Sequence, residues 1–219
     1  MIPGVDRSHH NSPYPMATLV AKGNKFVWLK VAQWTTGEDK TFNASWQEAK
    51  NTVGLLRGGY YFLDPRFDGI EQCKQFLSFG INFTAAGCIG GCVDVEDLVV
   101  FDANGINKAL TAQANKWVAD NWQLALRRLW DFLNYFKEQT GLNCIIYSYN
   151  NYMREYYHST PFPNNPMWLS SLQATCPPRY DTGKLPEFWQ LTYNWQNSDM
   201  DGDFYTGTQE QLNTLANIV

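Results

Sequence analysis

Short apolar runs alternate with longer amphipathic segments along this chain. The apolar runs have the length of strands, and they predict strands at residues 5–8, 26–32, 58–62, 93–96, 144–148, 168–170, 188–192 and 200–203. Strands interleaved with helices are typical of a largely parallel sheet or barrel. Eight such strands favour an α/β fold built as a single β/α barrel.

The clearest helical pattern covers residues 106–139, where apolar residues recur at roughly helical spacing. Asn121 marks a candidate break within this helix, and Gly141 is expected to end it. Shorter helices are predicted at residues 44–55 and 70–79, and loops at 161–166 and 175–183. The helical signal is poor after Tyr147. We therefore expect fewer regular helices around the later strands.

Two acids stand two residues apart at the end of the fourth predicted strand, in the segment Val-Asp-Val-Glu-Asp at residues 93–97. In a strand of period two, Asp94 and Glu96 point the same way. Such a pair favours one protonated carboxyl at neutral pH, which is the state that a general acid needs to cleave a glycosidic bond. A solvated acidic turn is the alternative interpretation of the segment alone.

Further acids lie near the ends of the first and eighth predicted strands, at Asp6 and Asp201. Barrel enzymes keep their chemistry at the C-terminal ends of the strands, and strands one and eight become neighbours when a barrel closes. We therefore expect Asp6, Asp94, Glu96 and Asp201 to converge.

Composition sets limits on the function. The chain has 219 residues, 44% of them hydrophobic, and this permits one domain over residues 1–219 with a sizeable core. A formal net charge of −4 without a basic run argues against nucleic acid or an anionic membrane as partners. No apolar stretch has the length of a spanning helix, and residues 1–4 contain no leader, so we expect a leaderless chain or one whose leader has been removed.

Five scattered cysteines do not form a disulfide framework for a chain of this length. Cys88 and Cys92 could form a small loop disulfide, but we expect two buried thiols. The three histidines offer no second spaced pair to complete a tetrahedral zinc site, so we expect no metal.

The acidic segments and the stretches between them resemble the glycoside hydrolase family 25 muramidases, lysozymes that cut the peptidoglycan glycan. Residues 4–10 (GVDRSHH) are similar to that family's opening G-[IV]-D-x-S-x-H, and residues 93–97 to its central D-x-E-D. Residues 200–208 are similar to its closing V-D-x-[ND]-x-[FY]-x-G. This match puts the fourth acid at Asp201, with Asp199 as the alternative.

Weaker similarities follow in the family's order over nearly the whole chain. They are residues 25–30 (KFVWLK), 58–62 (GGYYF), 145–148 (IIYS), 167–169 (MWL) and 188–192 (FWQLT). The clearest departure follows Lys30, where the family commonly has K-A-[TS]-E and this chain has Gln33 in place of the acid. Gln33 cannot ionise, so the cleft loses one negative charge. The resemblance implies an irregular, flattened β/α barrel.

By this resemblance Glu96 is expected to act as the general acid and Asp94 to remain charged and orient the 2-acetamido group of the substrate. Asp6 and Asp201 are expected to position the sugar, a water molecule or Glu96. Substrate assistance, a carboxylate nucleophile and inversion all stay open, because the separations between the carboxyl groups discriminate them.

Sugar binding needs flat apolar faces beside polar groups. Tyr60, Tyr147, Trp168 and Trp189 stand at predicted strand ends where a glycan could lie. His10, Lys30 and Gln33 complete the expected substrate-binding residues, although His10 could also be a loop histidine bonded to backbone.

The sequence thus predicts an N-acetylmuramidase that hydrolyses β-1,4 bonds in bacterial peptidoglycan without metal or organic cofactor. A phage-type endolysin is the expected subtype, held in the host cytoplasm before it acts at the cell wall, and no separate wall-binding domain is expected. A chitinase-type glycosidase and a non-catalytic glycan-binding module are the alternatives.

Overall fold

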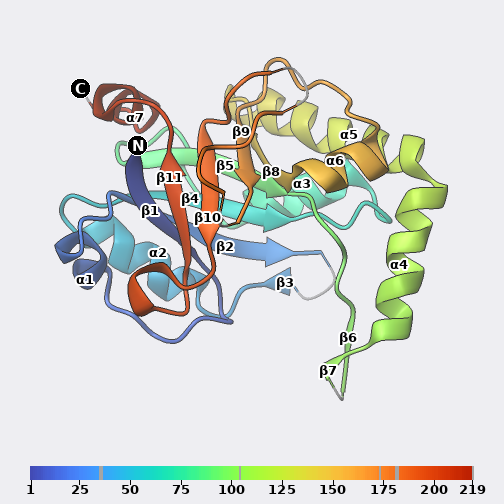
Figure 1. Cartoon of the computed structure of the whole chain (residues 1–219), viewed down its shortest axis with the longest axis horizontal. Helices are drawn as coiled ribbons and strands as arrows, with labels where there is room; N and C mark the ends of the chain where they lie inside the picture. The colour runs from blue at the N-terminus through green and yellow to red at the C-terminus, as the bar shows by residue number, and fades with distance from the viewer. Residues whose placement is uncertain (35–36, 104, 173, 181–182, 219) are drawn as a thin grey trace.

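The computed structural model describes residues 1–34, 37–103, 105–172, 174–180 and 183–218. Within them a nine-stranded sheet runs in the order β1-β11-β10-β9-β8-β5-β4-β2-β3, and a further pairing of β1 with β2 closes it into an eight-stranded barrel (Figure 1). The barrel strands are β1 (Ile2–Arg7), β2 (Phe26–Gln33), β4 (Leu56–Phe62), β5 (Cys88–Asp94), β8 (Ile145–Tyr149), β9 (Met167–Ser170), β10 (Phe188–Thr192) and β11 (Asp201–Tyr205). The short β3 (Gly37–Glu38) adds to the edge of β2. The predicted irregular β/α barrel is confirmed.

The last strand runs against its neighbours. β11 pairs antiparallel with both β1 and β10, whereas the pairs from β1 through β2, β4, β5, β8 and β9 to β10 are parallel. Only residues 193–200 join β10 to β11, which is shorter than the dozen or more residues that a parallel crossover needs. Asp201 therefore begins β11, and its expected place at the C-terminal end of an eighth parallel strand is wrong.

The helices are unevenly distributed around the barrel. They are α1 (Met16–Ala21), α2 (Phe42–Asn51), α3 (Gly69–Ser78), α4 (Lys108–Asp120), α5 (Trp122–Thr140), α6 (Asn150–Tyr157) and α7 (Gln209–Leu215). The break at Asn121 and the end at Gly141 are confirmed, since α4 and α5 meet at Asn121 and Gly141 has a left-handed φ of 76°. The described residues between β9 and β10 form no helix, in agreement with the weak signal there.

The predicted helix at residues 106–139 begins too early. Ile106 belongs to a small hairpin formed by β6 (Phe101–Asp102) and β7 (Gly105–Ile106). α4 begins only after Asn107, whose side chain accepts a hydrogen bond from the backbone N–H of Leu110 and so caps the helix. Hairpin and α4 lie at the end of the molecule away from the two chain termini (Figure 1).

Aromatic side chains fill the inside of the barrel, where glycines on neighbouring strands make room for them. Trp28 stacks on Trp168 with ring centroids 5.3 Å apart, and Gly58 is the register partner of Trp28 on β4. Gly4 of β1 stands in the same relation to Phe26. Because glycine has no Cβ, each ring can lie directly over the backbone of the neighbouring strand.

Gly58→Ala is expected to destabilise the protein by about 1–3 kcal/mol, measured by urea unfolding. A Cβ at position 58 would lie 2.1 Å from the ring of Trp28, which is fully buried and cannot move aside. Trp28→Phe provides the control, since the smaller ring should relieve the clash and make the double variant less destabilised than the sum of the two single variants. Additive free energies would contradict this packing.

A second core fills the space between the barrel and its helices, with Phe76, Phe132 and Phe136 stacked at its centre. Cys88 and Cys92 are buried free thiols, as predicted. No helix in the described part of the chain has the length and apolarity to cross a membrane.

Candidate active site

A cavity of about 220 Å³, which we call the acid cavity, opens at the end of the barrel where β1 and β5 finish. The four predicted acids line it together: Asp6, Asp94, Glu96 and Asp201. Asp6 is the register partner of Asp201 on adjacent antiparallel strands, so closure of the barrel brings the two ends of the chain together at this point. The predicted convergence of the acids is confirmed.

Asp94 and Glu96 reach the cavity from different backbone settings. Asp94 is the last residue of β5 and pairs with Phe62 and Tyr147 on the neighbouring strands. Glu96 lies beyond the strand, after a last bond from the N–H of Val95 to the carbonyl of Tyr147. The two side chains still line one cavity, although they do not lie on one regular strand as expected.

Glu96 combines access to the cavity with a carboxyl that holds its proton. Removal of the carboxyl from water raises the pKa of Glu96 to about 7, and the nearby charges of Asp6 and Asp97 raise it as well. The ammonium group of Lys30 acts in the opposite direction. Glu96 is therefore substantially protonated at neutral pH, as a general acid must be.

Asp94 is buried more completely than Glu96. Its Oδ1 has no hydrogen-bond partner among the described residues. Burial, together with the charge of Glu96, raises the pKa of Asp94 well above its ordinary value, and Lys30 opposes this shift. Burial and the missing donor at Oδ1 thus oppose the expected negative charge of Asp94, whereas Lys30 favours it.

Gln190, which the sequence analysis missed, joins the acids of the first and last strands. Its Nε2 donates to Asp6 Oδ2 at 2.8 Å and to Asp201 Oδ2 at 3.3 Å, while its Oε1 accepts from the hydroxyl of Tyr147 at 2.8 Å. Burial raises the pKa of Asp6 to about 6 and that of Asp201 to about 8, and the charge of Asp6 adds to the shift at Asp201. Period-two alternation from Phe188, which faces the barrel interior, could have identified Gln190.

Asp203 is a fifth acid beneath the cavity, and it was also missed. Trp168 Nε1 donates to its Oδ1 at 2.8 Å, whereas Oδ2 has no donor among the described residues. Complete burial and the charge of Asp6 raise the pKa of Asp203 well above its ordinary value. The alternation of Asp201 and Asp203 along β11 was the available signal.

Three of the four predicted sugar-binding aromatics reach the acid cavity, namely Tyr60, Tyr147 and Trp168. The fourth does not. Trp189 lies on the opposite face of β10 from Gln190, where its Nε1 donates to the carbonyl of Ser171 and its ring packs on Phe204. Trp189 is 2% exposed, so it is not in position to contact a sugar in this cavity.

The remaining predicted residues surround the acids. Lys30 is buried, and its Nζ donates to Gln33 Oε1 at 2.7 Å. Burial lowers the pKa of Lys30, while the charges of Asp94, Asp39 and Glu96 oppose this. His10 lines the acid cavity, and Gln33 lines a neighbouring cavity that His10 also borders.

The acid cavity continues on both sides. Toward α6 it adjoins a cavity of about 660 Å³, the α6-side cavity, and the two share four lining residues, Glu96, Tyr147, Gln190 and Asp201. In the other direction it adjoins a cavity of about 300 Å³, the hairpin-side cavity, with His10 in common. The acids thus lie within a groove that extends past them in two directions. Among the described residues no group of three or more His, Cys, Asp or Glu is placed to hold a metal ion.

Glycoside hydrolases need a carboxyl that keeps its proton beside further acids in an open groove. The mouth of this barrel provides that arrangement. The chain belongs to the glycosyl hydrolases of family 25, whose family model matches residues 5–200.

Several characterised proteins are similar over nearly their whole length. An N,O-diacetylmuramidase of Arthroderma benhamiae is 25% identical over 98% of this chain and 86% of that protein. An N,O-diacetylmuramidase of a Chalaropsis species is 24% identical over 98% of this chain and 99% of its own. The solved structure of a bacterial lysozyme from Streptomyces coelicolor shares the fold with a TM-score of 0.81 at 21% identity, covering 99% of this chain and 97% of that one.

Proposed function

We propose that this protein is an N-acetylmuramidase that hydrolyses the β-1,4 bond between N-acetylmuramic acid and N-acetylglucosamine in bacterial peptidoglycan. Membership of family 25 and the names of the two muramidase relatives support the substrate. The observation that carries the proposal is Glu96, a carboxyl with a pKa of about 7 in a groove open on both sides. A groove of this form suits cleavage within a polymer.

Glu96 donates its proton to the glycosidic oxygen as the bond from C1 of the muramic acid to that oxygen breaks. The electron pair of the bond goes to the departing glucosamine hydroxyl, and positive charge develops at C1. Those of the surrounding acids that are ionised stabilise this charge. Glu96 is left as a carboxylate that can take a proton from the water molecule of the second step.

Asp94 orients the 2-acetamido group of the same sugar. The N–H of that group supplies a donor to Asp94 Oδ1, which has none among the described residues, and a hydrogen bond to the charged form favours ionisation. The acetamido oxygen then attacks C1, so that the substrate provides the nucleophile, and water later opens the ring that forms. Asp6, Asp201 and Gln190 hold the sugar and this water molecule in place.

The test is digestion of purified peptidoglycan, reduction of the new ends with borohydride and mass spectrometry of the fragments. We expect reduced N-acetylmuramic acid at the new ends and none with Glu96→Gln. New ends that carry N-acetylglucosamine would contradict the proposed bond. Cleavage of chitin alone would favour the chitinase-type alternative.

The glycan-binding module without activity is disfavoured, because all four predicted acids line one cavity and none has been lost. Gln33, the one candidate loss, lies outside the acid cavity. The names of the relatives support the bacterial cell wall as the place of action. The phage-type endolysin subtype and the route to the wall stay predictions from the sequence.

A further inference from the structure

The hairpin-side cavity has an exposed aromatic ring on its wall. Its lining residues are His9, His10, Gln33, Glu38, Lys40 and Phe101. Phe101, on β6, is 50% exposed, and its ring lies nearly parallel to that of His10, with centroids 6.4 Å apart and planes 23° apart. A phenylalanine this exposed leaves apolar surface in water, and on the wall of a cavity that surface is available to pack against a ligand.

The same ring borders a further hollow of about 150 Å³, where Trp34, Phe62 and Arg66 also line the wall. Gln33 belongs to both spaces, so they adjoin. Beyond His10 the groove therefore offers aromatic faces from Phe101 and Trp34 next to polar groups. A pyranose ring needs this combination, since its C–H face packs on an aromatic ring and its hydroxyl and acetamido groups need hydrogen bonds.

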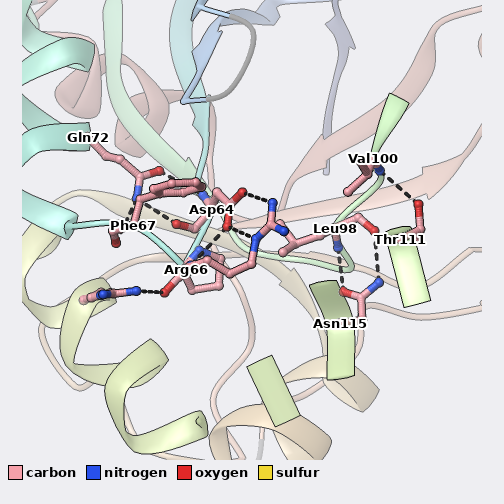
Figure 2. A network of polar contacts seen from close by, with 10 residues as sticks. Asp64, Arg66, Phe67, Gln72, Leu98, Val100, Thr111 and Asn115 are labelled. Atoms are coloured by element: carbon pink, nitrogen blue, oxygen red, sulfur yellow. Dashed lines mark hydrogen bonds and ion pairs between the residues drawn. The ribbon is translucent and has the colours of Figure 1, made fainter. Parts of the chain in front are cut away.

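Residues 98–101, which lead into the hairpin and line the hollow, are held in place by polar contacts with α4 (Figure 2). Asn115 bonds both backbone groups of Leu98, with its Oδ1 accepting from the N–H at 2.8 Å and its Nδ2 donating to the carbonyl at 3.0 Å. Thr111 Oγ1 accepts from the N–H of Val100 at 3.0 Å. These bonds fix the segment that joins Glu96 to Phe101, so the platform is ordered before a ligand arrives.

Asp64 and Arg66, which also line the hollow, are held in place by further polar contacts (Figure 2). Arg66 donates from Nε and Nη2 to the two carboxylate oxygens of Asp64, at 2.9 and 2.6 Å. Gln72 bonds the backbone N–H and carbonyl of Asp64 at 2.9 and 2.8 Å. Both sides of the hollow are thus ordered by the protein itself.

We propose that the hairpin-side cavity and the hollow beside it form an additional saccharide subsite, with Phe101 as its stacking platform. The occupant is a sugar of the same glycan strand, remote from the bond that is cleaved, because this space shares His10 with the acid cavity. Gln33, Glu38 and Lys40 bond the polar substituents of that sugar. The inference rests on the proposed function, and it predicts that this enzyme favours long glycans over short ones.

The test is kcat/KM for a series of purified peptidoglycan glycans of increasing length. For wild type we expect kcat/KM to rise with length until the subsite is filled. Phe101→Ala should remove the last rise, lowering kcat/KM about 3- to 10-fold on long glycans and less than about 2-fold on the shortest cleaved glycan. Phe101→Trp, which keeps an aromatic face, should stay near wild type.

Ile106→Ala is the matched control, because Ile106 pairs with Phe101 in the hairpin, is 59% exposed and does not line the hairpin-side cavity or the adjoining hollow. It should keep the wild-type length profile. An equal loss in both variants, or a loss from Phe101→Ala that is the same at every length, would overturn the subsite. If wild type cleaves no glycan, the proposed function fails instead. Calorimetric binding of long and short glycans to Glu96→Gln, with and without Phe101→Ala, then decides the subsite separately.

Discussion

Glu96→Gln is expected to lower kcat on peptidoglycan by about 10³-fold, which corresponds to about 4 kcal/mol of activation free energy. The amide matches the carboxyl in size but carries no proton that it can transfer to the leaving oxygen. Reducing ends released over time from purified cell walls provide the measurement. Retention of more than a tenth of the wild-type rate would exclude Glu96 as the general acid.

The same variant should remain folded, and its stability has a defined pH dependence. Burial raises the pKa of Glu96 from 4.5 to about 7, so the favourable contribution of its protonated form is complete below pH 4.5 and is lost as pH rises through 7. Glutamine has no such loss. At pH 8 the thermal midpoint of Glu96→Gln should equal or exceed that of wild type, so that lost activity cannot be ascribed to unfolding.

Asp94→Asn is expected to lower kcat/KM by about 10²-fold, because an amide cannot become the carboxylate that orients the acetamido group and supports its attack on C1. Initial rates on the same cell walls measure this loss.

Asp199→Asn is the matched control, since Asp199 was the alternative to Asp201 in the sequence. Its Oδ2 accepts from the N–H of Ser12 at 2.6 Å in an exposed position, and it does not line the acid cavity. This variant should stay within about 2-fold of wild type. Comparable losses in the two variants would show that any acid near this mouth matters, and would contradict the specific role of Asp94.

The acid cluster could be predicted from the sequence because its residues lie at or near the ends of strands. Alternation placed Asp94 and Glu96 together, and closure of a barrel brought Asp6 to Asp201. The order of the weaker motifs added what no single motif could establish, because short apolar strings recur in many strands. Free thiols at Cys88 and Cys92 also followed from the odd and scattered cysteine set.

Other features depend on tertiary context that a linear pattern does not contain. The direction of β11 followed from the length of one connection, which the strand assignment did not weigh. Trp189 and Gln190 are adjacent, so the choice of which one faces the cavity depended on the face of β10. Asp203 is buried under the other acids, and Phe101 lies on a hairpin that periodicity had partly assigned to a helix.

A carbon-13 NMR titration of the glutamate carboxyls, with the Glu96 signal assigned by its absence in Glu96→Gln, tests most directly whether the buried cluster keeps the general acid protonated. We expect this signal to titrate with a pKa near 7, and kcat/KM to fall as pH rises through the same range. A pKa near 4.5 would contradict this, because Glu96 would then be a carboxylate at neutral pH with no proton to donate.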